Sequence, residues 1–256
     1  MLRLREQSFG PEQRLVMAIV KQTPDSGYDR GASWDEAAAM ERVHTVVGEG
    51  ADIVDIGGGP AAPGAEVTVA EEIRRTVPFV AAVRAAYPDL LISVDAYRHQ
   101  TARELCAAGA DLINDTGEGW DEQLPEVAAS CGAGLVERTL ALAKRAVARG
   151  VDPSRVLIEP TYDSGKNTRP SLEVTRQLGD MVTTGWPVLV PVSRGGIRTA
   201  GREERPAGTL ATTAVYAWLG ARVFRVYQVT QTRQVLDMVS AIRGDRPPAR
   251  AVRGLA

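Results

Sequence analysis

Residues 50–65 read GADIVDIGGGPAAPGA, and this segment predicts the fold. Gly50 is suited to end a helix, because glycine readily adopts the left-handed conformation that follows many last helical turns. Residues 51–56 are mainly apolar, as in a parallel strand that is buried on both faces. The glycines after them are typical of a loop whose backbone approaches a ligand closely. The segment therefore predicts a helix end, a buried strand and a loop at a candidate site.

The same unit recurs, since Gly-Ala precedes an apolar stretch at residues 50, 109, 132 and 220. Apolar stretches predict eight strands, at residues 15–20, 51–56, 90–95, 110–115, 133–136, 155–160, 185–193 and 220–227. Each is followed by a helical pattern, and the helices are expected at residues 33–47, 68–86, 98–107, 122–130, 138–149, 171–182, 205–219 and 230–243. Ser33 with Glu36 and Thr68 with Glu71 fit capping boxes at two helix starts.

Alternating strands and helices predict an α/β protein with a parallel sheet. Eight such units in 256 residues predict a TIM (β/α)8 barrel that forms one domain over residues 1–256. A doubly wound sheet is the alternative. Residues 1–14 are expected to form an edge strand or a plug.

The composition is that of an ordinary globular protein, with 44% hydrophobic and 24% charged residues. A net charge of −2 gives no reason to expect nucleic acid or an anionic membrane as a partner. The first residues are too charged for a signal peptide, and no apolar run is long enough to cross a bilayer. Cys106 and Cys131 lie in Ala-rich surroundings and are expected to be buried free thiols, which favours the reducing cytoplasm.

Polar residues stand at the carboxyl ends of the predicted strands, where TIM barrels carry their active sites. They are Lys21, Asp55, Asp95, Asn114, Asp115, Glu159, Ser193, Arg194 and Tyr227. One such residue alone could merely cap the following helix, but capping does not explain so many at the same end. The sequence therefore predicts a polar site at one mouth of the barrel.

The junction between Val136 and Glu137 is unusual, because the predicted strand there meets a helical pattern directly. A strand-to-helix connection needs about 2 residues to reverse direction. Either the strand is not where the pattern places it, or the chain is discontinuous at this junction, and our hypothesis is a missing or deleted loop at 136/137.

Several motifs together resemble dihydropteroate synthase. They are the segments MAIVKQTPDS (17–26), DIVDIGG (52–58), PGA (63–65), ISVD (92–95) and IND (113–115). The motifs span nearly the whole chain in the family's order, and the chain resembles a divergent second copy of actinobacterial type. The resemblance implies a cytoplasmic TIM barrel and a homodimer. In folate biosynthesis such a transferase joins dihydropterin-methyl pyrophosphate to p-aminobenzoate with Mg²⁺: pyrophosphate leaves first, and the arylamine captures the pterin cation.

The resemblance also assigns candidate site residues. Asp95 and Asn114 match residues that hydrogen-bond the pterin ring, and their acceptors and donors suit it. Glu159 stands where the family has Asp, Lys166 matches a Gly-Lys pair, and Arg225 matches an arginine that helps to hold pyrophosphate. Ser193 and Arg194 match the first two residues of the family's Ser-Arg-Lys.

Other positions depart from the family. Lys21 replaces an Asn that binds the metal-pyrophosphate, and a protonated lysine cannot ligate Mg²⁺ although it could neutralise phosphate. Residues 59–62 read GPAA where the family has Glu-Ser-Thr-Arg, Gly195 replaces the lysine of Ser-Arg-Lys, and Tyr227 replaces a histidine. No metal ligand is therefore assigned, and Mg²⁺ is implied by the resemblance alone.

Three functions follow from this balance. The first is a synthase homologue with weak or no synthase activity and a small-molecule site for a pterin or related heterocycle. The second is an active dihydropteroate synthase. The third is a barrel that serves another biosynthetic reaction. In each, Lys21 and Arg225 are the catalytic candidates, and the substrate-binding candidates are Asp95, Asn114, Glu159, Lys166, Ser193 and Arg194.

Overall fold

The computed structural model describes residues 1–21, 36–57, 67–160, 168–192 and 205–247. Eight parallel strands form one sheet, in the order β8-β7-β6-β5-β4-β3-β10-β9. The strands are β3 (Leu15–Lys21), β4 (Ile53–Gly57), β5 (Leu91–Ala96), β6 (Leu112–Asp115), β7 (Gly134–Glu137), β8 (Val156–Ile158), β9 (Leu189–Pro191) and β10 (Val223–Val226). A parallel bridge between Ile158 and Val188 brings the two outermost strands together. The predicted TIM barrel is thereby confirmed.

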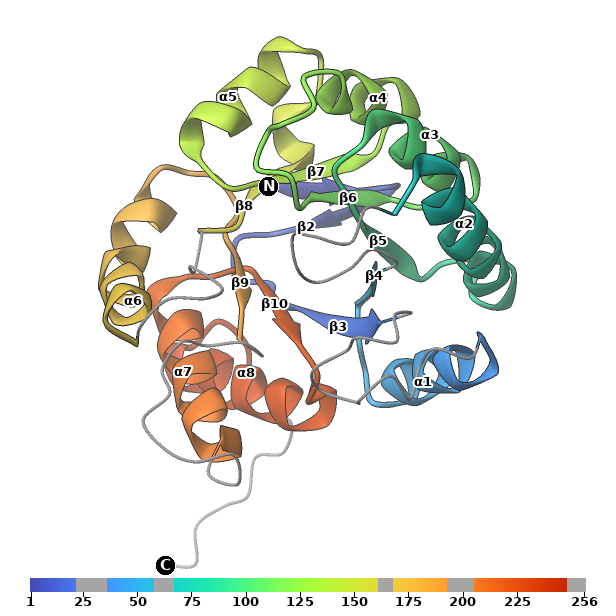
Figure 1. Ribbon diagram of the computed structural model, residues 1–256. Coiled ribbons are helices and arrows are strands. Elements are labelled where there is room, and N and C mark those ends of the chain that lie inside the picture. Colours follow the sequence, from blue (N-terminus) through green and yellow to red (C-terminus); the bar gives the residue numbers. More distant parts are fainter. Residues whose placement is uncertain (22–35, 58–66, 161–167, 193–204, 248–256) are drawn as a thin grey trace, which may run out of the picture.

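Helices surround the barrel, one after each strand (Figure 1). They are α1 (Glu36–Gly48), α2 (Val69–Ala86), α3 (His99–Ala107), α4 (Leu124–Cys131), α5 (Leu140–Ala148), α6 (Thr168–Thr183), α7 (Arg205–Leu219) and α8 (Val229–Arg243), and a 3-10 turn, η1 (Pro153–Arg155), precedes β8. Thr68 caps α2 as predicted, since its hydroxyl accepts a hydrogen bond from the Glu71 N–H at 3.2 Å. The Glu71 carboxylate turns instead to Arg74 and Arg75. The predicted cap at Ser33 lies outside the described residues.

The recurring Gly-Ala unit has the predicted role. Gly50, Gly109, Gly132 and Gly220 follow helix ends with φ angles of 91°, 116°, 66° and 103°. A side chain is strained at these angles, and glycine is not. The unit therefore turns each of these four helices back toward the next strand.

Alternation along the strands divides the core into two layers. An outer layer between strands and helices includes Val54, Ile92 and Phe224, whereas an inner layer inside the barrel includes Ile53, Leu91 and Val223. The amino-terminal hairpin, β1 (Leu2–Leu4) with β2 (Gln7–Phe9), adds the side chains of Leu2, Leu4 and Phe9 to the inner layer. The plug predicted for residues 1–14 is thereby confirmed, and it fills the end of the barrel at which the strands begin.

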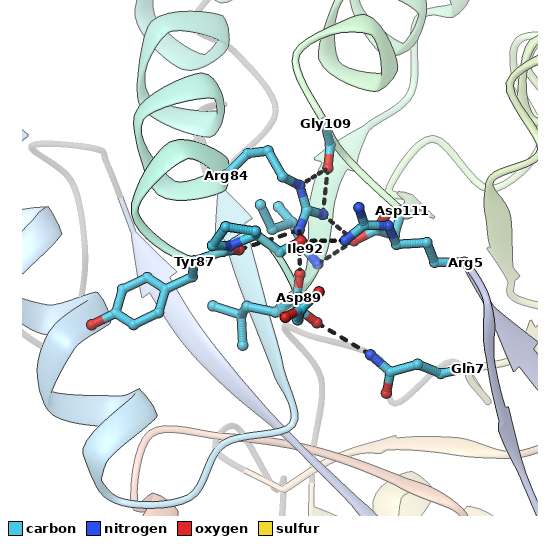
Figure 2. A network of polar contacts seen from close by, with 10 residues as sticks. Arg5, Gln7, Arg84, Tyr87, Asp89, Ile92, Gly109 and Asp111 are labelled. Carbon is cyan, nitrogen blue, oxygen red and sulfur yellow. Dashed lines mark hydrogen bonds and ion pairs between the residues drawn. The ribbon is translucent and has the colours of Figure 1, made fainter.

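Polar side chains tie the hairpin and the helix–strand loops together at that end (Figure 2). The Arg84 guanidinium donates to the carbonyls of Gly109, Pro88 and Leu90, each at 2.8 Å, and pairs with Asp111. From the hairpin, Arg5 donates to the Pro88 carbonyl and Gln7 to the Asp89 carbonyl. One arginine of α2 therefore holds two loops in place.

The strand–helix junction near residue 136 differs from its prediction. Val136 and Glu137 are consecutive residues of β7, and α5 begins at Leu140 rather than at residue 138. The Thr139 hydroxyl caps α5 by accepting from the Leu142 N–H at 3.2 Å. Arg138 and Thr139 thus form a two-residue connection, which meets the steric minimum. The sequence pattern suggested that no turn separates strand and helix, and this was wrong. A missing or deleted loop in this region stays a prediction.

Cys131 also differs from its prediction, because it is exposed, while Cys106 is half-buried. Both thiols are free as predicted. Within the described ranges, every helix is too short or too polar to span a bilayer.

Candidate ligand site at the barrel mouth

The barrel mouth receives its side chains from the inward positions at the strand ends. These side chains come from positions that lie two or four residues after an inner-layer residue on the same strand or its end. The positions are Asp55, Asp95, Asn114, Glu159 and Arg225. Because side chains alternate along a strand, these groups all point into the barrel. The parallel register then places Asp55 beside Ser93 and Asp95 beside Asn114.

Arg225 joins the two aspartates. Its Nε donates to Asp55, which is fully buried, and its Nη2 lies 3.2 Å from each carboxylate oxygen of Asp95. The Ser93 hydroxyl donates to the other oxygen of Asp55 at 2.7 Å. The guanidinium predicted to hold pyrophosphate is therefore paired with carboxylates of its own chain.

Burial sets the charge balance of this group. It raises the pKa of Asp55, although Arg225 acts in the opposite direction. Burial alone would lower the pKa of Arg225, but the charges of Asp55 and Asp95 outweigh it and raise that pKa. The arginine therefore stays charged and acts as the counter-ion of the mouth.

A second arginine, Arg138, enters from the end of β7. It pairs with the Glu159 carboxylate, and its Nη2 donates to the Asn114 Oδ1 at 3.4 Å. The Asn114 amide nitrogen in turn donates to Asp95 at 2.9 Å. One continuous network thus runs from Arg138 through Asn114 and Asp95 to Arg225, and it uses both groups predicted to bind a pterin.

Glu159 is not fully satisfied by this network. One of its oxygens pairs with Arg138, whereas the other, Oε2, is buried and has no hydrogen-bond partner among the described residues. A buried acceptor without a donor is unfavourable. This oxygen is therefore a candidate acceptor for a ligand N–H group.

A separate polar cluster lies on the outward side of the same strand ends. Asp115 accepts from the N–H groups of Gly117 and Gly119, each at 2.8 Å. Glu137 is buried, and its Oε2 has no partner among the described residues. Burial, together with the nearby Asp115, raises the pKa of Glu137 to about 7. Since these groups face the helices, the cluster belongs to the outer layer rather than to the mouth.

The structure thus brings together the predicted residues Asp55, Asp95, Asn114, Glu159 and Arg225. Asp115 was also predicted at the mouth, and this was wrong, because it alternates with the inward Asn114 and faces outward. The backbone of Lys21 ends β3 opposite Gly57, but its side chain lies outside the described part, as do Lys166, Ser193 and Arg194. Sequence reasoning missed Arg138. Its signal was available, because Val136 belongs to the inner layer and Arg138 is two residues further along.

The mouth network is distinct from a surface hollow of about 360 Å³, which is lined by the first residues of α2 and α3 and by the segment before α4. The hollow is open, and Trp120 at its edge is 72% exposed. Its lining residues are Val69, Arg98, His99, Gln100, Trp120, Asp121 and Glu122. None of them takes part in the mouth network.

The described residues of the mouth do not fit a Mg²⁺ ion. Mg²⁺ prefers free carboxylate oxygens and water, whereas the carboxylates of Asp55 and Asp95 already face a guanidinium. Glu159 likewise faces Arg138, and position 21 carries a lysine. A metal cation at this place would compete with both arginines for the same carboxylate oxygens.

Comparisons with known proteins agree with this architecture. The model of a family described as pterin binding enzyme matches residues 17–141 and 136–227. The chain belongs to the pterin-binding enzyme family. The matched residues include strands β5, β6 and β10, which carry Asp95, Asn114 and Arg225.

Individual members of the pterin-binding family are similar over nearly the whole chain. A Mycobacterium tuberculosis protein named "Inactive dihydropteroate synthase 2" is 48% identical over 279 aligned positions, covering 96% of this chain and 88% of that protein. The solved structure of Mycobacterium tuberculosis Rv1207 is 44% identical, with a TM-score of 0.78, covering 97% of this chain and 100% of that one. A Yersinia pestis dihydropteroate synthase, solved with a sulfonamide drug, is 27% identical, with a TM-score of 0.87 and coverages of 96% and 99%.

Proposed function

We propose that this protein is a dihydropteroate synthase homologue with weak or no synthase activity, which keeps a small-molecule site for a pterin or related heterocycle. One observation carries the proposal: Asp95 and Asn114, the matches to the pterin-binding residues, are present but bonded to each other and to two arginines. The name given to the Mycobacterium tuberculosis relative supports the loss of activity.

The substitutions support the same reading. Lys21, the GPAA segment at residues 59–62, Gly195 and Tyr227 stand where the family pattern has groups that contact its substrates. Each lost charged contact costs about 1–3 kcal/mol, so several together lower the rate by orders of magnitude. The same losses fall on pyrophosphate and arylamine contacts more than on the pterin ring, which leaves weak pterin binding in place.

The test is a turnover assay with dihydropterin-methyl pyrophosphate, p-aminobenzoate and Mg²⁺, with the Yersinia pestis synthase as the active control. We expect turnover at least about a thousandfold below the control. In parallel, a titration with the pterin pyrophosphate, followed by tryptophan fluorescence, should show weak binding. Turnover within tenfold of the control, or growth of a folate-synthesis mutant that carries this gene, would reject the proposal.

Ligand binding at this mouth is further proposed to be independent of Mg²⁺. The support is the position of Arg225 and Arg138, which are already paired with the three carboxylates. The pterin titration is repeated with Mg²⁺ and with a chelator. A change in affinity of less than about twofold is expected, and a strict requirement for the metal would contradict this part.

The connection between β7 and α5 is proposed to be shorter here than in the relatives. The two segments of the family match overlap at residues 136–141. In addition, 96% of the 256-residue chain is about 246 residues, so about 33 of the 279 aligned positions have no residue here. Measuring the intact mass of the natural protein tests this. A mass above that of the 256-residue sequence would mean that a segment is missing rather than deleted.

The protein is also proposed to be a cytoplasmic homodimer. Two free thiols are compatible with a reducing compartment. For the dimer, the support is four exposed apolar side chains on α7 and α8, which are in contact with each other: Val215, Trp218, Met238 and Ile242. Light scattering should give a dimer for the natural chain and a monomer for Trp218→Glu with Met238→Glu. Leu140→Glu on α5 is the matched control and should stay dimeric.

A further inference from the structure

The position of Arg138 follows from the short connection in which it lies. Val136 packs in the inner layer with Leu112 and Leu157, so the side chain two residues later points into the barrel as well. Thr139 follows at once as the cap of α5, which holds the backbone of Arg138 at the mouth. Its side chain is only 13% exposed. A residue in a longer loop would not be fixed in this way.

The contacts of Arg138 resemble those of a bound ligand. Its guanidinium is planar and presents N–H donors in a fixed fork. One arm pairs with the Glu159 carboxylate, and another donates to the Asn114 Oδ1. The amino-pyrimidinone edge of a pterin has the same N–C–N arrangement and offers N–H donors to carboxylate and amide acceptors. The guanidinium and such an edge therefore compete for the same two acceptors.

We propose that Arg138 is the specificity-determining residue of the barrel mouth, because its guanidinium occupies the acceptor positions that would otherwise bind a planar, guanidine-like edge of a ligand. That the competing ligand is a pterin rests on the proposed function. That Arg138 occupies the acceptors Glu159 and Asn114 does not depend on it. Glu159 Oε2, buried and without a described partner, shows that the acceptors are not all used. Removing Arg138 takes away the described donor of Glu159 Oε1 and its bond to Asn114 Oδ1, so that these acceptors join Glu159 Oε2 as available to a ligand.

The first test is a gain of binding. Arg138→Ala and Arg138→Met are titrated with 6-hydroxymethylpterin by fluorescence, beside the natural chain. Arg149→Ala is the matched control, because Arg149 directly follows α5, has an exposed side chain and pairs with Glu126. Both Arg138 variants should bind at least about tenfold more tightly than the natural chain, and Arg149→Ala should bind as it does. Two variants are used so that one poorly folded protein does not decide the result.

The second test does not involve a pterin. Guanidinium chloride at 10–20 mM, far below denaturing concentrations, should raise the melting temperature of Arg138→Ala but not that of the natural chain or Arg149→Ala. Sodium chloride at the same concentration is the control for ionic strength. Rescue by guanidinium without pterin binding in any variant would uphold the role of Arg138 and reject the pterin part of the proposed function. Folded Arg138 variants that show neither rescue nor tighter pterin binding would overturn the inference.

Discussion

Arg225 illustrates how neighbouring residues change what one side chain can do. In isolation, an arginine at the end of the last strand suggests an anion site. Here two carboxylates of the same chain already surround it. Removing one member of a buried ion pair leaves an uncompensated charge, which is more costly than losing the pair as a whole.

Arg225→Met is therefore expected to lower the free energy of unfolding by about 3–5 kcal/mol at pH 7. Asp55 is fully buried and would lose its charged partner. The double variant Arg225→Met with Asp55→Asn should recover more than half of that loss. Urea unfolding measures both. A single variant as stable as the natural chain would show that the mouth does not depend on this pair.

Glu137 predicts a dependence of stability on pH. Its pKa is about 7 in the folded chain, because of burial first and Asp115 second, against an ordinary value of 4.5. Since the folded state holds the proton more tightly, this residue stabilises the fold fully below about pH 4.5, and that contribution is lost as the pH rises through 7. Glu137→Gln should therefore be more stable than the natural chain at pH 8, by up to about 3 kcal/mol, and nearly equal at pH 4.5.

The measurement for Glu137 is urea unfolding across pH 4.5 to 8. The same change at exposed Glu122 serves as the control and should leave the pH profile unaltered. If Glu137→Gln had the same profile as the natural chain, the raised pKa would be refuted.

At the scale of elements, local sequence predicted most of the barrel. Helix α7 has the expected bounds of residues 205–219, because a continuous helical pattern defines it. Strand β9 is much shorter than expected, at Leu189–Pro191 instead of residues 185–193. Gly185 has a φ of 85°, which departs from strand geometry, and Pro187 has no N–H to donate, although its carbonyl accepts the Ile158 N–H. These two residues carried the signal for the true strand start.

The Gly-Ala-Asp units show an element-scale device that sequence alone did not reveal. Asp52 accepts the Val16 N–H at 2.7 Å, and Arg233 binds Asp52 and the Gly50 carbonyl. In the equivalent unit, Asp111 accepts the Ile92 N–H at 2.9 Å, and Arg84 binds Asp111 and the Gly109 carbonyl (Figure 2). The partner arginine comes from a different helix each time, which requires the folded structure to be seen.

Arg84→Ala should accordingly lower the free energy of unfolding by about 2–3 kcal/mol, because four loop carbonyls and Asp111 lose their donor. Chemical denaturation measures the change, and exposed Arg103→Ala on α3 is the control, with an expected effect below about 0.5 kcal/mol. An equally small effect of Arg84→Ala would mean that water replaces this arginine without cost.

For the whole molecule, the sequence predicted a barrel with a polar mouth but not how its polar groups pair. Strand periodicity places Asp55, Asp95 and Arg225 at one end of the barrel. Their mutual bonds depend on the barrel register. It pairs β10 with β3, so that Arg225 stands beside Met17 although 208 positions separate them in the sequence. For residues 1–14 the sequence likewise left two alternatives, an edge strand or a plug. The contacts of the hairpin with the inner layer decide for the plug.

Leu4→Ala tests the contribution of the plug to the whole fold. Leu4 is fully buried, and a Cβ atom added at Gly134 would lie 2.8 Å from its Cδ2, so the space around it is closely filled. The truncation should lower the free energy of unfolding by about 2–4 kcal/mol. Leu140→Ala, at an exposed apolar position, is the control. A loss below about 1 kcal/mol would show that the hairpin stabilises the barrel little.

The hairpin has a practical consequence for measuring ligands. It packs where the strands begin, and the side chain of Met1 is 70% exposed. A tether or label joined to residue 1 therefore sits at the opposite end of the barrel from Asp95 and Asn114. Coupling the protein to a sensor surface through this end should leave the ligand entrance facing the solution, whereas random coupling through lysines would not fix the orientation.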